Sequence, residues 1–259
     1  MSLNSESHIK KLRESGLWET GKIIIQALLL ALVVRVFFYQ PFNIPSGSMK
    51  STLLVGDYLF VSKLSYGYSR HTFPYSPPLF SGRIWSGDPK LGDVVVFKLP
   101  RDNTTDYIKR VVGLPGDTVQ MRDGVLFING EAVPKERDGY FETRDDDGRL
   151  VRIPKYRETL PNGVVYHVLD ERQNGPADNT RVFTVPDGHY FMMGDNRDNS
   201  TDSRIAWGGV DFVPHENLVG RAEIIFFSAA FDDPDAFRLL TPWRWPMDVR
   251  WSRFFTLVR

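Results

Sequence analysis

The chain has 259 residues, of which 42% are hydrophobic, so it is long and apolar enough for one large or two modest folded units with a real core. Its 32 lysines and arginines balance 32 aspartates and glutamates, so no net charge attracts it to nucleic acid, and we expect no nucleic-acid partner. The lack of cysteine excludes disulfides, thiolate metal ligands and thiol nucleophiles.

The N-terminal region predicts a membrane anchor. Residues 1–17 are polar, whereas residues 23–34 are apolar except for Gln26, and the apolar run resumes after Arg35. A helix over residues 18–39 would extend roughly 30 Å at about 1.5 Å per residue, which matches the hydrocarbon core of a bilayer. We therefore expect a short tail at 1–17 and a single transmembrane helix at 18–39.

Two other interpretations of the apolar segment are weaker. Its uninterrupted part is short enough for a buried core helix or for a cleaved signal sequence. A cleaved signal needs small residues just beyond its apolar core, where this chain has mainly valine, arginine and phenylalanine at 33–38. Because basic residues precede the helix, the positive-inside rule places the N-terminus in the cytoplasm and residues 40–259 outside it.

Beyond the anchor, short runs of β-branched and aromatic residues predict strands. The expected strands are 58–63, 93–99, 107–112, 118–122, 125–128, 164–169, 181–185, 189–193 and 223–227. Asp123-Gly124 and Asn129-Gly130 predict tight hairpin turns, because both central residues of a type I′ turn have positive φ. The expected fold is mostly β, with one N-terminal transmembrane helix followed by a β-rich domain that carries an inserted second β-lobe at about 119–186.

Two stretches lack a clear strand pattern. Residues 64–89 are rich in Tyr, Ser, Pro and Gly, and they predict a long irregular loop or an extended hairpin. Residues 135–158 are densely charged, and they predict the solvated surface of the insertion.

A short hydroxyl-rich loop follows the apolar segment. Pro45 disfavours helix there and Gly47 permits a turn, so Ser46 and Ser48 are expected on a loop that precedes the strand at 58–63. Taken alone, this pattern fits an ordinary Ser/Gly turn as well as a loop that presents a nucleophile.

One lysine, Lys109, lies within an apolar predicted strand. Its side chain could simply extend to solvent, as lysines commonly do. If it is buried instead, desolvation disfavours the charged form and lowers its pKa from about 10.4 toward neutrality. A neutral lysine could then accept a proton from a serine, as in the Ser-Lys variants of the serine protease triad.

The stretch 193–204 carries several carboxylates and amides. An EF-hand calcium loop is excluded, because Arg197 stands at the third ligand position, where an oxygen donor is required. A plain polar loop is one alternative. A triad of Ser48 with His189 and Asp195 is another, but His189 follows Asp-Gly at the expected start of a strand, where a structural role is sufficient.

These stretches together resemble the bacterial type I signal peptidases, also called leader peptidases. The matching segments are PSGSM at 45–49, TLLVGDYLFVSK at 52–63, LGDVVVF at 91–97, DYIKRVVGLPGD at 106–117, GHYFMMGDNRDNSTDSR at 188–204 and LVGRAEIIFFS at 218–228. They follow one another in the order found in the family. The resemblance implies a serine endopeptidase that works through an acyl-enzyme, with no cofactor and no metal.

The resemblance also implies roles for individual residues. Ser48 would be the nucleophile and Lys109 the general base. The Ser46 hydroxyl and the Ser48 backbone N–H would bind the oxyanion, and Ser200 would orient the Lys109 amine by a hydrogen bond. Two further residues match the pair that shapes the site around these groups: Asp202 and Arg204.

The implied substrates are signal-peptide-bearing preproteins, cut after a small residue with another small residue two places before it. The positions that match the family's substrate pockets are Phe42, Ile44, Met49, Leu53, Tyr107 and Ile108. The other implied partners are the lipid bilayer and, as a candidate, the protein export machinery. The expected location is the inner (cytoplasmic) membrane, with the catalytic domain in the periplasm. Two features depart from the family: Ser51 stands where the family often has proline, and residues 64–89 have no counterpart that we can assign.

The C-terminal run 242–259 mixes Trp, Phe and Arg. It suits a segment that touches the bilayer surface through aromatic residues and through Arg250 and Arg253, and it equally suits a segment packed on the β-core. Two other functions are weighed against the peptidase. A membrane-anchored binding domain would not need Ser48 together with Lys109, and a self-cleaving Ser-Lys repressor would need a DNA-binding head in place of the anchor.

Overall fold

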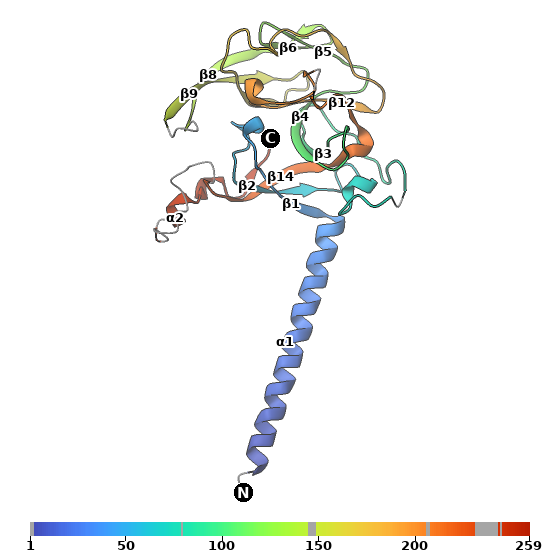
Figure 1. Cartoon of the computed structure of the whole chain (residues 1–259), viewed down its shortest axis with the longest axis vertical. Helices are drawn as coiled ribbons and strands as arrows, with labels where there is room; N and C mark the ends of the chain where they lie inside the picture. Colours follow the sequence, from blue (N-terminus) through green and yellow to red (C-terminus); the bar gives the residue numbers. More distant parts are fainter. Residues whose placement is uncertain (1–2, 79, 145–148, 206–207, 231–242, 244) are drawn as a thin grey trace.

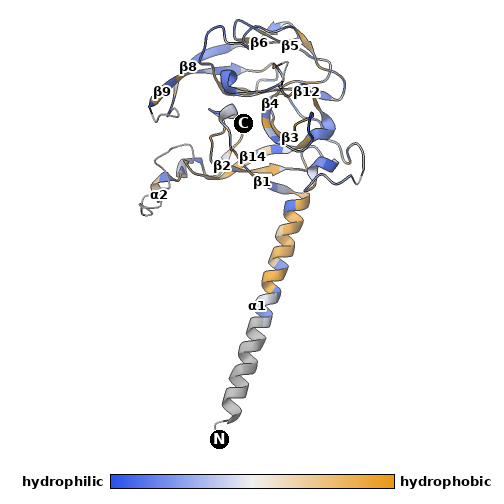
Figure 2. Cartoon of the chain, viewed as in Figure 1, coloured by the Kyte–Doolittle hydropathy of each residue, from blue (hydrophilic) through white to orange (hydrophobic). Residues whose placement is uncertain are grey.

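The computed structural model describes residues 3–78, 80–144, 149–205, 208–230, 243 and 245–259, and over 3–17 the backbone alone. A single long helix, α1 (Leu3–Phe37), leads away from a β-rich body, as Figure 1 shows. Its segment Trp18–Phe37 is long and apolar enough to cross a membrane, and none of it is buried inside the protein. In Figure 2, the part of α1 next to the body is coloured mainly as hydrophobic.

The ends of α1 differ from the prediction of 18–39. The helix begins at Leu3, so most of the expected tail is helical, and it ends at Phe37. Tyr39 instead opens the first strand, where it pairs with Ser62. The helix stops early because ladder hydrogen bonds of the sheet replace helical ones at this point.

The body is built on an eight-stranded sheet whose main path has the order β1-β2-β14-β3-β4-β12-β13, with β15 paired to β14. All of its strand pairs are antiparallel. Its strands are β1 (Tyr39–Asn43), β2 (Asp57–Ser62), β3 (Val94–Lys98), β4 (Asp106–Gly113), β12 (His189–Met193), β13 (Val213–Pro214), β14 (Leu218–Ser228) and β15 (Thr256–Leu257). A mostly β fold with an N-terminal apolar helix is therefore confirmed.

Between β4 and β12 the chain forms two smaller sheets, with orders β11-β5-β6-β7 and β10-β9-β8. Their strands are β5 (Thr118–Arg122), β6 (Val125–Ile128), β7 (Glu131–Ala132), β8 (Lys135–Arg144), β9 (Leu150–Thr159), β10 (Val165–Leu169) and β11 (Phe183–Thr184). Asp123 (φ 49°) and Gly124 (φ 73°) have positive φ at the β5–β6 turn, as do Asn129 and Gly130 at the next turn, so both predicted hairpin turns are confirmed.

The stretch 135–158 was predicted only as the solvated surface of the insertion, and most of its side chains are indeed at least partly exposed, but its two strands were not predicted. This stretch forms β8 and β9, two ten-residue strands joined by residues 145–148, which lie outside the described part of the chain. Buried Ile153 pairs with Phe141 across the hairpin, whereas most other side chains of the pair are at least partly exposed. The charged residues belong to the exposed positions of a long hairpin, and this hid the strand pattern.

The C-terminal run packs on the body through its arginines. Arg250 donates to the carbonyls of Val55 (2.9 Å) and Ala229 (3.1 Å), and Arg253 binds the buried Asp57 carboxylate. The expectation that these two arginines face the bilayer surface is therefore wrong, because their guanidinium groups are directed into the protein. The exposed aromatic side chains of the run include Trp243, Trp251 and Phe255, and residues 242 and 244 lie outside the described chain.

Candidate active site

The hydroxyl-rich loop lies between β1 and β2 and is closed by a single 3-10 turn, Gly47–Met49. The Asn196 backbone N–H donates to the Ser48 carbonyl (3.0 Å), and the Asn196 side-chain amide donates to the Gly47 carbonyl (2.9 Å). Ser48 is buried, whereas Ser46 is exposed. The loop is thus held in place by the polar stretch that follows β12.

Lys109 reaches the loop from the middle of β4. Its Nζ lies 2.7 Å from Ser48 Oγ and 2.9 Å from the Ile108 carbonyl, and the residue is only 3% exposed. Burial lowers the pKa of Lys109 to about 8, although the Asp202 and Asp195 carboxylates oppose this change. A substantial fraction of the amine is therefore neutral near physiological pH, and a neutral amine can accept the Ser48 proton.

A second buried lysine shows why geometry decides the role. Burial, aided by Arg35, also lowers the pKa of Lys63 to about 8. Its Nζ, however, donates to the carbonyls of Val36 (3.1 Å) and Thr72 (2.6 Å), and these cannot act as nucleophiles. Of these two amines, only that of Lys109 is paired with a hydroxyl.

Ser46 lies on the same loop as Ser48, with its Oγ 3.5 Å from Ser48 Oγ. The residue has an extended backbone (φ −129°, ψ 155°) and lines a cavity of about 890 Å³ together with Ser48 and Lys109. A carbonyl group placed over Ser48 would therefore meet the Ser46 hydroxyl within the same cavity.

The stretch after β12 is shaped by a buried ion pair. Arg204 donates through Nε and Nη2 to the two oxygens of Asp202, both at 2.9 Å, and Asp202 also accepts from the Gly194 N–H (2.9 Å). Burial alone would raise the pKa of Asp202, but the Arg204 guanidinium and the Gly194 N–H lower it. Asp202 is therefore a carboxylate that holds the stretch after β12 in place beside Ser48 and Lys109.

The predicted hydrogen bond from Ser200 to Lys109 is not formed. Ser200 Oγ is buried without a hydrogen-bond partner among the described residues, and it lies so close to Gly194 that a Cβ on that glycine would be 2.2 Å from it. Lys109 Nζ has its contacts with Ser48 and Ile108 instead. An orienting role for Ser200 stays a prediction.

Gly194 is the residue that leaves room for this arrangement. A Cβ there would lie 2.2 Å from Ser200 Oγ and 2.6 Å from the Ser48 carbonyl oxygen. We expect Gly194→Ala to lower kcat by about 100-fold or more, because small displacements of reacting groups have effects of this size. Gly21→Ala, where the added Cβ has nothing within 4 Å, is the matched control in a peptide-cleavage assay. Unchanged kcat in Gly194→Ala would contradict this interpretation of the site.

The residues expected to form substrate pockets fall into two groups. Tyr107 and Ile108 line the cavity, on β4. Ile44, Met49 and Leu53 are buried in the apolar cluster beneath the loop, which Ile108 joins and against which Phe42 packs. The far wall of the cavity is formed by Thr143, Val151 and Ile153 of the β8–β9 hairpin and by residues 171–172.

Three polar contacts around the site were not anticipated from the sequence. Arg110, next to Lys109, forms a fully buried two-pronged ion pair with Asp195 (2.8 and 2.7 Å). Arg197 forms a second buried ion pair with Glu158 of β9. The Asn196 side-chain amide donates to the Gly47 carbonyl and so holds the loop that carries Ser48. The only signal in the sequence was the pair of adjacent charges, Lys109 and Arg110, within an apolar strand. Because successive residues of a strand face opposite sides, two adjacent charges place a charge on each face of the sheet, including any buried face.

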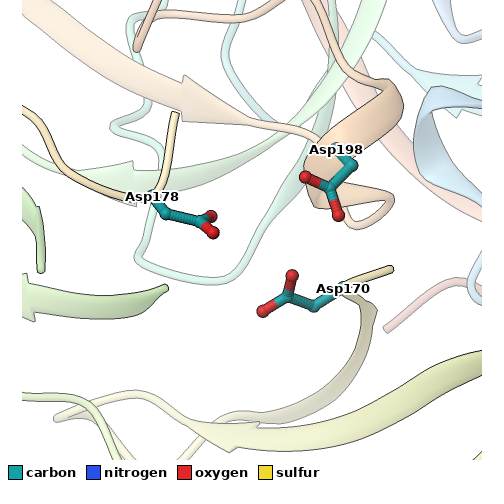
Figure 3. A group of neighbouring side chains, drawn as sticks. All are labelled: Asp170, Asp178 and Asp198. Atoms are coloured by element: carbon teal, nitrogen blue, oxygen red, sulfur yellow. The ribbon is translucent and has the colours of Figure 1, made fainter. Parts of the chain in front are cut away.

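The alternative triad is not assembled. His189 Nδ1 lies 2.9 Å from the Asp187 carbonyl at the start of β12, and Asp195 is paired with Arg110. A group of three carboxylates, Asp170, Asp178 and Asp198, lies nearby (Figure 3).

These three carboxylates already have partners. Lys135 donates to Asp170, the backbone N–H groups of residues 171 and 172 donate to Asp198, and that of Gly175 donates to Asp178. Burial and the two neighbouring carboxylates raise the pKa of Asp178. The group thus fastens residues 170–178 to the loop that follows β12.

Comparison with known proteins places this geometry in a family. The model of the family described as signal peptidase, peptidase S26, matches residues 17–227. The chain is 40% identical over 233 residues to signal peptidase I of Rickettsia akari (strain Hartford), covering 87% of this chain and 84% of the relative. It is 37% identical over 265 residues to signal peptidase I of Rickettsia massiliae (strain Mtu5), covering 97% of this chain and 96% of the relative.

A solved structure of a signal peptidase I from Enterococcus faecalis V583 is 28% identical, covers 52% of this chain and 96% of its own, and superposes with a TM-score of 0.30. The family match and the relatives extend over most of the chain and include both the loop at 45–49 and the stretch 188–204. The predicted resemblance is therefore confirmed: this chain belongs to the signal peptidase family, peptidase S26, and is a serine endopeptidase.

Proposed function

We propose that this protein removes signal peptides from exported preproteins, with Ser48 as nucleophile and Lys109 as general base. The observation that carries the proposal is the 2.7 Å contact between Lys109 Nζ and Ser48 Oγ at the edge of a solvent-accessible cavity. The family membership and the signal peptidase I relatives support the same reaction.

In the first half of the reaction, Ser48 Oγ attacks the scissile carbonyl while its proton passes to the neutral Lys109 amine. The negative charge that develops on the carbonyl oxygen is bound by the Ser46 hydroxyl and the Ser48 backbone N–H. When the C–N bond breaks, the Lys109 ammonium gives its proton to the leaving amine, which is the new N-terminus of the mature protein.

In the second half, a water molecule replaces the leaving amine. Lys109 accepts a proton from this water as its oxygen attacks the ester carbon of the acyl-enzyme, and the C–O bond to Ser48 then breaks. The proton returns from Lys109 to Ser48 Oγ. The signal peptide leaves with a new C-terminal carboxylate, and the enzyme regains its starting state.

Ser46 offers a direct test of the oxyanion assignment. We expect Ser46→Ala to lower kcat by about 100- to 1,000-fold with little change in KM, since loss of one oxyanion donor has this effect in serine proteases. Ser46→Thr keeps the hydroxyl and is the matched variant. Steady-state cleavage of a peptide substrate measures both constants, and an equal loss in the alanine and threonine variants would count against a hydrogen-bonding role.

The proposed specificity is for small residues at the cleavage site and two places before it. Ile44, Met49 and Leu53 form an apolar cluster with Ile108, and apolar walls of this kind would reject large or charged side chains by sterics and desolvation. An extended substrate segment can lie between the 41–45 segment and the start of β4, with alternate side chains pointing into these pockets.

The proposed location follows from α1. The span Trp18–Phe37 anchors the protein in the inner (cytoplasmic) membrane, with the N-terminus in the cytoplasm and the catalytic domain in the periplasm. Contact of the exposed C-terminal aromatic residues with the bilayer and contact with the export machinery stay predictions.

The decisive experiment is cleavage of a preprotein with an Ala-x-Ala site by the full-length protein in detergent micelles, compared with Ser48→Ala. The wild type should cut after the second alanine, and Ser48→Ala should fall to background while unfolding at the same temperature. The rival is a membrane-anchored binding domain, which would bind the preprotein without cutting it. An inactive wild type, or an active Ser48→Ala variant, would remove the proposal.

A further inference from the structure

The stretch between β2 and β3 forms a structured hairpin, which we call the aromatic hairpin (residues 66–78 and 80–87). Its two arms are joined by a pair of backbone hydrogen bonds between Tyr68 and Ile84, at 2.9 and 2.8 Å. Gly67 has φ +76° and lies against the opposite arm so closely that a Cβ there would be 2.2 Å from the Trp85 carbonyl oxygen. Residues 64–89 were predicted to form either a long irregular loop or an extended hairpin. The structure shows a hairpin.

A single arginine ties the hairpin to the main sheet. Arg83 Nη1 donates to the Gly67 carbonyl (2.8 Å), and Nη2 donates to the carbonyls of His215 (2.8 Å) and Leu218 (2.5 Å). These contacts join both arms of the hairpin to the start of β14. The hairpin therefore has a fixed position on the catalytic body.

The same hairpin packs on the last turn of α1. The Phe37 ring contacts those of Tyr68 and Phe73, with centroids 6.5 and 6.3 Å apart, and the Tyr68 hydroxyl donates to the Phe37 carbonyl. Lys63 adds a third link, because its Nζ donates to Val36 and Thr72. In Figure 1 the hairpin is the teal segment beside the junction of α1 and β1. It therefore lies level with the end of the apolar span.

The hairpin exposes two large aromatic side chains in strained backbone positions. Tyr75 is 103% exposed with φ 64°, and Trp85 is 82% exposed with φ 52°. Left-handed backbone geometry is unusual for bulky residues and is energetically unfavourable. Tyr75 is not covered by the protein, and Trp85 makes an edge contact with the Tyr68 ring (centroids 5.9 Å apart) but stays mostly exposed, so packing inside the described chain accounts for little of this arrangement.

Tyrosine and tryptophan are the residues enriched at membrane–water interfaces, where an apolar ring and a polar tip are both satisfied. We propose that the aromatic hairpin inserts Tyr75 and Trp85 into the phospholipid headgroup region next to α1, as a second, rigidly attached membrane contact. The proposal rests on the membrane anchoring by α1 in the proposed function, and it does not depend on the dyad. With two points of contact, the catalytic body keeps a fixed tilt on the bilayer.

The chain has no cysteine, so single labels can be placed without other changes. Tyr75→Cys and Trp85→Cys would each carry an environment-sensitive fluorophore in the full-length protein, reconstituted in nanodiscs of phosphatidylcholine and phosphatidylglycerol. Glu131→Cys, on exposed β7, is the aqueous control, and Leu29→Cys, within the span, is the lipid control. Quenching by a lipid-bound nitroxide near the headgroup and quenching by aqueous iodide are then measured.

Labels at 75 and 85 should be quenched by the nitroxide lipid at least about twofold more than the label at 131, and they should be shielded from iodide. If the label at 29 is quenched by lipid while those at 75 and 85 behave like 131, the hairpin contact is refuted and the anchor stands. If the label at 29 is also accessible to iodide, the anchor fails, and the hairpin contact fails with it. A hairpin that instead binds a protein partner would give the first of these two outcomes.

A double variant provides a functional readout. Tyr75→Ser/Trp85→Ser should lower cleavage of a preprotein embedded in vesicles by about tenfold, because the anchored site is no longer held at a fixed tilt to the surface, which lowers its effective concentration at the cleavage site. Cleavage of a short soluble peptide should not change. Equal loss on both substrates would show damage to the fold and would overturn this interpretation.

Discussion

Replacing Lys109 with methionine is expected to lower kcat/KM by about 1,000- to 10,000-fold, because the same amine accepts the Ser48 proton and later supplies the proton to the leaving group. Methionine keeps most of the apolar stem, so the packing of the buried side chain should change little. Lys63→Met is the matched control, since it removes a buried amine of similarly lowered pKa that contacts only carbonyls. Cleavage of a soluble peptide by both variants separates loss of the base from loss of a buried lysine. Comparable loss in the two variants would argue against a base at 109.

The same assignment fixes the pH dependence. Because burial lowers the pKa of Lys109 from 10.5 to about 8, the active neutral form is a minority at pH 7 and the majority above pH 8. We expect kcat/KM to rise about tenfold per pH unit below this pKa and to level off above it. This rise of kcat/KM with pH should be absent from the residual activity of Lys109→Met. If kcat/KM instead rose with an apparent pKa near 10.5, the Lys109 amine would be solvated in the free enzyme.

Asp195→Asn is expected to lower the free energy of unfolding by about 3–5 kcal/mol, because it leaves the Arg110 guanidinium buried without a counter-charge. Both partners are almost completely buried, and Arg110 also donates to the Gly92 carbonyl (2.7 Å), the Thr52 hydroxyl (3.3 Å) and an Arg259 oxygen (3.1 Å). Urea unfolding of the full-length protein in detergent micelles measures the change. Asp106→Asn is the control, because its ion pair with Lys98 is partly exposed and should contribute less than about 1 kcal/mol.

A double variant separates the charge effect from packing. Arg110→Met/Asp195→Leu removes both charges, so it should be less destabilised than Asp195→Asn alone. If the single variant lost less than about 1 kcal/mol, the buried pair would not hold β4 against the stretch after β12. If the double variant were the less stable of the two, the cause would lie in shape and lost hydrogen bonds rather than in an isolated charge.

Much of the fold was accessible from the sequence, because its signals are local. β-branched and aromatic runs predicted both ends of β2, β3, β4 and β12 to within one residue. The Asp-Gly and Asn-Gly pairs predicted their turns. β8 and β9 were missed because most of their side chains are at least partly exposed, so no apolar face marked them as strands. The end of α1 was missed because pairing of β1 with β2, a tertiary contact, overrides the local apolar run.

The candidate site divides in the same way. The pairing of Ser48 with Lys109 followed from the family resemblance, and the structure brings the two side chains together. The partners of Arg110 and Arg197 could not be predicted, because each lies on a segment distant in sequence and the match depends on three-dimensional packing. The Ser200 hydroxyl, buried and unpaired within the described chain, could not be predicted either, because it depends on how the stretch after β12 packs around it.

The insertion between β4 and β12 has a consequence for how this family can vary. Gly113 and Phe191, at its two ends, are paired neighbours in the main sheet, and the proposed nucleophile, the base and the stretch 194–204 all lie outside it. Each doubling of such a loop adds only about 0.6 kcal/mol of closure entropy, so evolution can lengthen or shorten it at low cost. The buried ion pair of Arg197 with Glu158 is one constraint on this freedom. A relative with a reduced lobe must supply another acceptor for that arginine or replace it.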